Sequence, residues 1–288
     1  MNFYLPDFYK RYKLNVYLID LIRNHPEFFY ENINVPALYG TFPGAIWNGG
    51  RRIIGISTQE EIVNTVLSLN ANGIKLRYTF TNSEIEEKHL SDTYCNMIMD
   101  ISNNGFNEIL VNSKILENYL RKNYPNFKYI YSTTNCERDV NNLNNLCLNY
   151  DLVVMDYRDN TNFDLLSKLT QKEKIEILLN AYCDPNCKNR LNHYKNLSLQ
   201  QLNFSNSNYE AFNCGILNRS FLEALDFPTV IKENDLYELY INHFKFNNFK
   251  IEGRLTNDID VIESYVYYLV KPIYKDRVRN LLLKTAFL

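Results

Sequence analysis

The chain has 288 residues, of which 45% are hydrophobic and 22% are charged, a balance typical of a globular protein long enough for one large barrel domain. Its 31 basic and 33 acidic residues leave a net charge of -2, which gives no electrostatic indication of duplex DNA or an anionic membrane as a partner. No stretch approaches the ~20 apolar residues that span a bilayer, and the start lacks the pattern of a secretion signal, so we expect a cytoplasmic protein without a membrane partner.

Short β-branched or aromatic runs alternate with amphipathic stretches along most of the chain. Residues 1–33 precede this alternation, and we expect them to form an N-terminal segment of helical and extended structure. Eight strands are predicted, over residues 36–42, 74–80, 108–112, 128–133, 152–156, 174–182, 229–232 and 249–254. Helices are predicted over residues 58–73, 83–105, 113–124, 138–148, 163–169, 219–225, 234–245 and 258–270.

Several of these helices begin at residues that commonly cap a helix. Thr58 precedes a stretch with acids in its first turn and Gly73 at its end, which indicates a complete helix. Ser83 has Glu86 three residues later, the pattern of a capping box. Ser113 is predicted to cap the next helix.

Eight strands that alternate with helices indicate a parallel sheet closed into a (β/α)₈ TIM-like barrel. We expect a single domain over residues 1–288, with an Asn-rich insertion over residues 183–218 at the barrel mouth, after the strand at 174–182. The strands at 36–42 and 229–232 have the weakest patterns. Without them, an open doubly wound sheet would be the alternative.

In barrels of this kind the chemistry lies at the C-terminal ends of the strands. The loop after the strand at 36–42 contains Trp47, Asn48, Gly49, Gly50 and Arg51. A Gly-Gly-Arg turn lets backbone amides approach an anion, and the guanidinium can hold phosphate or carboxylate. The alternative is a surface turn whose tryptophan packs into the barrel rim.

Other strands are followed by polar residues that also belong at this end of the barrel. Asp156, Glu252 and Arg254 are the candidate catalytic residues, since the strand at 249–254 directs the last two to the same side. Further candidates for substrate binding are Asn82, Asn112, Arg158 and Asn180. The alternative is that these residues cap helices or form structural ion pairs.

The six cysteines fall into two groups. Cys95 and Cys147 lie in apolar helical stretches and are predicted to be buried small hydrophobes. Cys136, Cys183, Cys187 and Cys214 all follow strands or lie in the insertion, so the topology places them at the barrel mouth. Thiolates in a reducing compartment suit zinc or an iron–sulfur cluster, with His193 as a substitute ligand. Two ordinary thiols in the turn "CDPNC" are the alternative.

The segment "FKIEGR", residues 249–254, and the cysteines after the strand at 174–182 resemble peptidase family U32, a collagenase-like group that includes iron–sulfur barrel proteins of RNA and quinone hydroxylation. The resemblance covers mainly residues 150–270 and indicates a distant, short relative. It implies a TIM-type barrel, a four-cysteine cluster, and oxygen insertion or peptidase activity. The matching positions are Lys250, Glu252, Gly253 and Arg254 on the strand, and Cys183, Cys187 and Cys214, with Cys136 as the fourth cysteine.

The leading hypothesis is a barrel enzyme with an iron–sulfur cluster that modifies, by hydroxylation or a related reaction, an anionic small molecule or a substrate derived from nucleic acid. Arg51 and Arg254 would hold the anionic group, with Asp156 or Glu252 as the general base. One alternative is a metal-free or zinc-dependent hydrolase or lyase acting on a sugar, nucleotide or peptide. Another is a non-catalytic barrel that binds RNA through its tyrosines. A protein partner is also left open.

Overall fold

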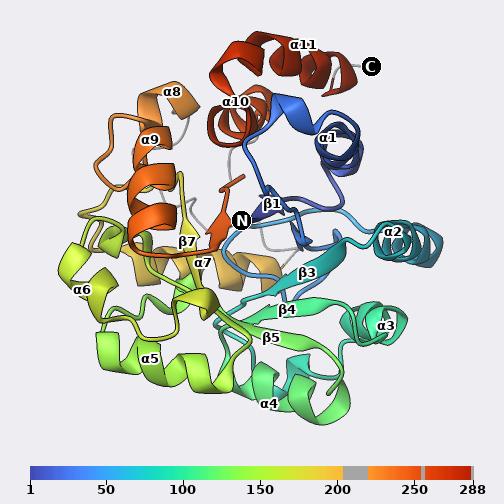
Figure 1. Ribbon diagram of the computed structural model, residues 1–288. Helices are drawn as coiled ribbons and strands as arrows, with labels where there is room; N and C mark the ends of the chain where they lie inside the picture. The colour runs from blue at the N-terminus through green and yellow to red at the C-terminus, as the bar shows by residue number, and fades with distance from the viewer. Residues whose placement is uncertain (204–219, 254–256, 287–288) are drawn as a thin grey trace.

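The computed structural model describes residues 1–203, 220–253 and 257–286. Eight parallel strands form a closed barrel in which each strand pairs with the next and β8 pairs with β1 (Figure 1). The strands are β1 (Asn2–Pro6), β2 (Ala37–Gly40), β3 (Lys75–Phe80), β4 (Glu108–Val111), β5 (Lys128–Tyr131), β6 (Leu152–Val154), β7 (Ile175–Leu178) and β8 (Asn248–Lys250).

Helices surround this barrel. They are α1 (Tyr12–Asn24), α2 (Gln59–Ala71), α3 (Thr93–Ser102), α4 (Lys114–Asn123), α5 (Val140–Asn149), α6 (Phe163–Lys168), α7 (Arg190–Leu202), α8 (Phe221–Ala224), α9 (Glu233–Asp235), the π-helical η6 (Leu236–His243), α10 (Asp258–Leu269) and α11 (Lys275–Ala286). Short 3₁₀ turns are η1 (Pro26–Phe28), η2 (Glu87–His89), η3 (Thr133–Asn135), η4 (Tyr157–Asp159), η5 (Lys172–Lys174) and η7 (Pro272–Tyr274). None of the helices in the described part of the chain has the length and apolar character of a membrane-crossing segment.

The predicted (β/α)₈ barrel is confirmed. The predicted number of strands is also correct, because one strand was missed and another was predicted where none forms. The first strand is β1 at Asn2–Pro6, inside the segment that was not assigned to the barrel, so the run at 36–42 forms the second strand. The run at 229–232 is not a strand. Its Val230 and Ile231 are buried, and the Ile231 amide donates to the Leu179 carbonyl, so packing on the outside of the barrel explains its apolar character.

The helix predicted over 83–105 is also shorter than expected. Its regular part, α3, begins only after Asp92, whose carboxylate accepts from the Cys95 amide, and Ser83 caps no helix. The other two caps are confirmed. Thr58 forms a reciprocal capping box with Glu61, and the Ser113 hydroxyl accepts from the Leu116 amide. The stretch contains two residues that commonly cap a helix, Ser83 and Asp92, and the prediction started the helix at the wrong one.

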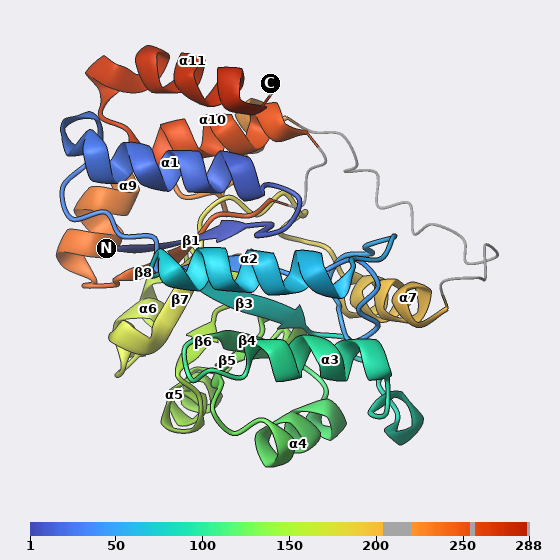
Figure 2. The same ribbon diagram turned by 90° about the vertical axis from the view of Figure 1, so that its right-hand side faces the viewer.

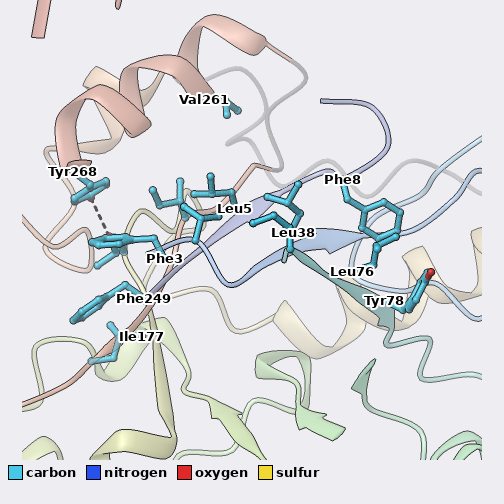
Figure 3. Close-up of a cluster of buried hydrophobic side chains, with 14 of the residues drawn as sticks. Phe3, Leu5, Phe8, Leu38, Leu76, Tyr78, Ile177, Phe249, Val261 and Tyr268 are labelled. Atoms are coloured by element: carbon cyan, nitrogen blue, oxygen red, sulfur yellow. Dashed lines mark hydrogen bonds between the residues drawn. The ribbon is translucent and has the colours of Figure 1, made fainter. Parts of the chain in front are cut away.

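Side chains alternate between the two faces of each strand, as a closed sheet requires. The outward ones, such as Phe3, Leu38 and Phe249, pack with the surrounding helices into the main apolar core (Figure 3). The inward ones form a small separate cluster around Tyr4, Leu110, Ile130 and neighbouring residues. The barrel lumen is thus filled with side chains rather than open.

The lumen also contains a buried ionic network. The Arg77 Nε donates to Glu108 Oε2 at 2.7 Å, and the other side of its guanidinium contacts Glu176 directly. Arg77 and Glu176 are completely buried, and the ring of Tyr4 lies 3.8 Å from the guanidinium carbon. Lys250 Nζ lies 3.8 Å from the second oxygen of Glu176. Such a network is stable only while its charges stay matched.

Helix α7 lies at the end of the barrel towards which the strands point (Figure 2). Its side chains bind loops from several strands: Arg190 donates to Thr133 Oγ1, Ser198 accepts from the Ser83 amide, and Gln201 donates to the Ala45 carbonyl. The helix falls within the predicted insertion at 183–218. It therefore ties the loops of the barrel mouth together.

Candidate functional site

The barrel mouth contains a cavity of about 80 Å³. Five of the residues predicted to bind or act on a substrate line it, namely Asn48, Gly49, Gly50, Arg51 and Glu252. The other polar lining side chains include Asp7, Lys250 and the hydroxyls of Thr79, Thr81, Ser132 and Thr134. The cavity is far smaller than the ~300 Å³ at the lower end of drug-sized sites, so it suits a small molecule or one group of a larger molecule.

Arg51 is held at the cavity by contacts with residues that follow β1 and β8, the first and last strands of the barrel. Its Nη1 donates to Asp7 Oδ1 at 2.6 Å, and its Nη2 donates to the Gly253 carbonyl at 2.7 Å. Asp7 follows β1 in the left-handed conformation, with φ of +63°, and also contacts the buried Arg11. A short polar side chain tolerates this conformation best. Asp7 thus orients two guanidiniums at the mouth.

The turn before Arg51 is held against the end of β3. The Asn48 amide side chain donates to the Arg51 carbonyl at 2.6 Å and accepts from the Thr79 hydroxyl at 2.7 Å. Gly49 lies so close to β3 that a Cβ there would approach the Thr81 carbonyl carbon and oxygen to 2.3 Å. Gly50 has φ of +71°. The two glycines therefore allow a close approach and a backbone conformation that other residues resist.

Lys250 ends β8 and Glu252 follows it by two residues, and both line the same cavity. Both side chains are almost fully buried. The Lys250 ammonium lies 4.0 Å from the centre of the Tyr39 ring. Asn180 fixes the backbone at Glu252 by accepting from its amide and donating to its carbonyl. Asn180 itself is therefore a positioning residue behind the cavity.

Hydroxyl groups form the side of the cavity near β5. The Ser132 and Thr134 side-chain oxygens lie 2.9 Å apart, and the Asn112 side-chain amide donates to Thr134 Oγ1 at 2.9 Å. Asn112 does not line the described cavity but orients a hydroxyl that does. Such hydroxyls can donate to a bound oxyanion or accept from a bound hydroxyl.

Asp156 belongs to a second polar cluster that does not line the described cavity. Arg158 binds both of its carboxylate oxygens, at 3.0 and 2.7 Å, and Arg190 from α7 contacts one of them. Burial alone would raise the pKa of Asp156, but the hydrogen bond from Arg158 and the charge of Arg190 outweigh it and hold that pKa below its ordinary value. A carboxylate held this way is a poor general base.

The Asp156→Asn substitution tests this structural role through pH. Because the folded-state pKa is depressed, the stabilisation by Asp156 is complete above its ordinary value of 3.8 and is lost as pH falls through the folded value. We expect the variant to lose about 2 kcal/mol of unfolding free energy at pH 7, and the difference from the parent to shrink below pH 4. Urea denaturation at pH 7 and pH 3 measures both. An equal difference at the two pH values would contradict the depressed pKa.

Two residues predicted to bind substrate, Trp47 and Asn82, are fully buried and do not line the described cavity. The Trp47 indole is fully buried, donates to the His89 carbonyl at 2.8 Å, and packs edge-on against Phe80 and Tyr119. Asn82 is fully buried and donates to backbone carbonyls of Ile46 and Ser198. The structure thus agrees with the alternative that the tryptophan packs into the barrel rim. Arg254 and Cys214 lie outside the described residues.

The described members of the predicted metal-ligand set follow β5 and β7, which β6 separates in the barrel. Cys136 ends the turn after β5 in a left-handed conformation, with φ of +55°. Cys183 packs near Tyr157, and the Cys187 amide closes a turn onto the Asp184 carbonyl. Across residues 1–203, 220–253 and 257–286, no three His, Cys, Asp or Glu side chains lie together as metal ligands would. These residues alone do not fit a cluster, and the iron–sulfur or zinc site stays a prediction. Cys95 and Cys147 are fully buried, as predicted.

Three important residues of the mouth were not predicted as site residues. Asp7 was missed because β1 was not recognised, although the aromatic run before it was a usable signal. Lys250 was noted only through the family resemblance, although it precedes Glu252 by two residues in the strand predicted at 249–254. Arg190 reaches Asp156 from a helix 34 residues further along the chain, and no local pattern indicates such a contact.

A parallel eight-stranded barrel with polar residues gathered at the C-terminal ends of its strands places the chain in the class of TIM-type barrel proteins. Its structure is similar to that of the U32 peptidase Mk0906, with a TM-score of 0.52 and 13% sequence identity over 88% of this chain and 92% of that chain. No protein-family model matches the sequence, and neither does any curated protein. At this identity the similarity shows the fold alone, a TIM-type barrel, as the resemblance implied.

Proposed function

We propose that the protein is a barrel enzyme that binds a small anionic substrate in the mouth cavity and uses Glu252 as its general acid–base. The observation that carries this proposal is the meeting of Lys250, Glu252 and Arg51 around one small cavity at the C-terminal end of the strands. Cations around a small enclosed space favour an anion, and a carboxylate beside them can move a proton.

The charge inside the described lumen supports an anionic ligand. Lys75, Arg77 and Lys250 supply three positive charges, whereas Glu108 and Glu176 supply two negative ones. Lys250 is the member of this network that lines the cavity. An anion bound beside Lys250 would interact favourably with this ammonium group in surroundings of low dielectric constant.

Glu252 is a better candidate base than Asp156. Its carboxylate lines the cavity, with one oxygen 3.4 Å from the Tyr182 amide, and Asn180 fixes its backbone. Asp156, in contrast, is held by two guanidiniums outside the cavity lining. A base must reach the proton that it removes, so the position of Glu252 at the cavity favours it over Asp156.

Calorimetric titration with pyruvate and with inorganic phosphate tests the proposal. We expect millimolar or tighter binding of at least one probe by the parent protein, and at least tenfold weaker binding after Lys250→Met, which leaves the Arg77 network with matched charges. The Glu252→Gln variant should bind the anionic probe as tightly as the parent or more tightly, because the substitution removes a negative charge that repels the anion. Lys168→Met removes an exposed lysine and serves as the control.

Two results would overturn the proposal. One is that neither anion binds to the parent protein. The other is that the Lys250→Met variant binds the same probe as tightly as the parent does, while the Lys168→Met control behaves identically.

Peptide hydrolysis is a second candidate, favoured by the structural similarity to a U32 peptidase. Glu252 could activate a water molecule for this reaction as well. The small volume of the described cavity favours a small substrate over a polypeptide.

A further inference from the structure

We infer that the mouth cavity selects a 2-hydroxy acid, a small molecule that carries a hydroxyl group on the carbon next to its carboxylate. This inference rests on the proposed function and names the substrate class of the same site. The ligand carboxylate lies against the cations and hydroxyl donors of the cavity, and the ligand hydroxyl donates to Glu252.

The first observation is a pair of hydroxyl groups, on Ser132 and Thr134, that has more protons than acceptors. The two oxygens lie 2.9 Å apart, so one hydroxyl donates to the other. Ser132 Oγ also accepts from the Thr134 amide, and Thr134 Oγ1 accepts from the Asn112 side chain. In the described part of the chain, the hydroxyl that accepts within the pair therefore keeps its proton for a ligand. Both side chains line the cavity.

Thr81 supplies a second hydroxyl donor on the same cavity. The residue is buried and lines the cavity, and its Oγ1 has no hydrogen-bond partner among the described residues. A Cβ added at Gly50 would lie 3.8 Å from this oxygen and 3.5 Å from Thr134 Cγ2, so Gly50 leaves open a space that the two threonines flank. Enclosed hydroxyls that lack a protein partner favour a ligand that accepts their hydrogen bonds. A carboxylate is such a ligand group, and it also suits the cations of the cavity.

Glu252 determines what else the ligand must carry. Its carboxylate shares this small cavity with Arg51 and Lys250, and one oxygen lies 3.4 Å from the Tyr182 amide. An ionised carboxylate offers about four acceptor positions and no donor, so it repels a second carboxylate that approaches it. A hydroxyl group on the ligand donates to Glu252 and replaces this repulsion with a charge-assisted hydrogen bond.

The small volume of the cavity sets the spacing of the two ligand groups. About 80 Å³ leaves little room for a chain between the carboxylate and the hydroxyl, so the two groups belong on neighbouring carbons. A simple carboxylic acid lacks the donor that Glu252 requires. Monohydrogen phosphate carries both an oxyanion and an O–H group, and it is therefore the competing ligand that the experiment has to separate.

Calorimetric titration of the full chain with glycolate and with acetate tests the inference, because the two ligands differ by one hydroxyl group. We expect the parent protein to bind glycolate about tenfold more tightly than acetate. In Glu252→Gln this ratio should fall to about threefold, because the neutral amide no longer repels acetate and accepts more weakly from glycolate. Thr81→Val should weaken both ligands about tenfold and leave the ratio unchanged, because it removes a donor to the carboxylate that they share.

Urea denaturation separates this role of Thr81 from a structural one. Because Thr81 Oγ1 has no partner among the described residues, Thr81→Val breaks no hydrogen bond there and should unfold at the same urea concentration as the parent or at a higher one. Thr170→Val is the matched control. It removes an exposed hydroxyl that bonds Asn144 before β7, so it should leave glycolate and acetate binding unchanged.

The outcomes distinguish the inference from the proposed function. Equal affinities of the parent for glycolate and acetate, or an unchanged ratio in Glu252→Gln, would refute the selection of a 2-hydroxy acid. Binding of phosphate without binding of glycolate would refute it as well and would leave the anion-binding function standing. If glycolate, acetate and phosphate all fail to bind, the proposed function fails and the inference fails with it.

Discussion

The Glu176→Gln variant is expected to lose about 3–5 kcal/mol of unfolding free energy, although the substitution removes no volume from the core. Glu176 is completely buried and is the carboxylate shared by Arg77 and Lys250. Its neutralisation leaves three positive charges in the described lumen against Glu108 alone. Breaking a buried ion pair from one side is costly because the remaining charge cannot be rehydrated.

Urea denaturation at pH 7 measures this loss, and Asp164→Asn is the matched control. Asp164 also pairs with a lysine, but 76% of its side chain is exposed, so its neutralisation should cost less than about 0.5 kcal/mol. Addition of Lys250→Met to Glu176→Gln should recover part of the loss by removing one unmatched cation. A loss below 1 kcal/mol in the single variant would show that the lumen is hydrated well enough to screen the network.

The Gly49→Ala variant is expected to lose about 3 kcal/mol and to weaken binding of any ligand in the mouth cavity. The added Cβ would lie 2.3 Å from both the carbonyl carbon and the oxygen of Thr81, so backbone rather than a flexible side chain must move. Displacement of this turn would also shift Arg51, whose carbonyl accepts from Asn48. Stability and ligand binding should therefore fall together.

Gly40→Ala provides the matched control. A Cβ at Gly40 would meet its nearest atoms at 3.4 Å, an ordinary contact, and Gly40 also lines the cavity. We expect this variant to unfold within about 1 kcal/mol of the parent in the same denaturation experiment. Equal losses in the two variants would mean that the close approach of Gly49 to β3 is not what requires a glycine.

The barrel could be predicted from the sequence because hydrophobic periodicity carries most of the information about parallel strands. Residues 152–155 are all apolar, as a strand buried on both faces requires, and β6 lies within them. The run at 229–232 also contains two buried apolar residues, Val230 and Ile231, but it packs against the outside of the barrel. Periodicity reports burial, and burial alone does not distinguish a barrel strand from a packed loop.

The candidate site could be predicted only where its residues are neighbours in the sequence. The turn from Asn48 to Arg51 and the position of Glu252 follow from local strand and turn patterns, and the structure gathers them at one cavity. The role of Asp156 depends on Arg190, which approaches it through the tertiary fold. The partner Arg158 is two residues away in the sequence, whereas the contact with Arg190 follows from the fold alone.

The closure of the barrel by its first and last strands constrains how the chain can fold as it is synthesised. Asn2 on β1 bonds Asn248 on β8 across 246 residues of sequence. At a synthesis rate of about 5–20 residues per second, β1 therefore waits roughly 12–50 s for its second neighbour. During that time its apolar outer face, including Phe3 and Leu5, lies at an open sheet edge that can pair with another chain. We therefore expect pairing of this edge with other chains to compete with folding until β8 has emerged.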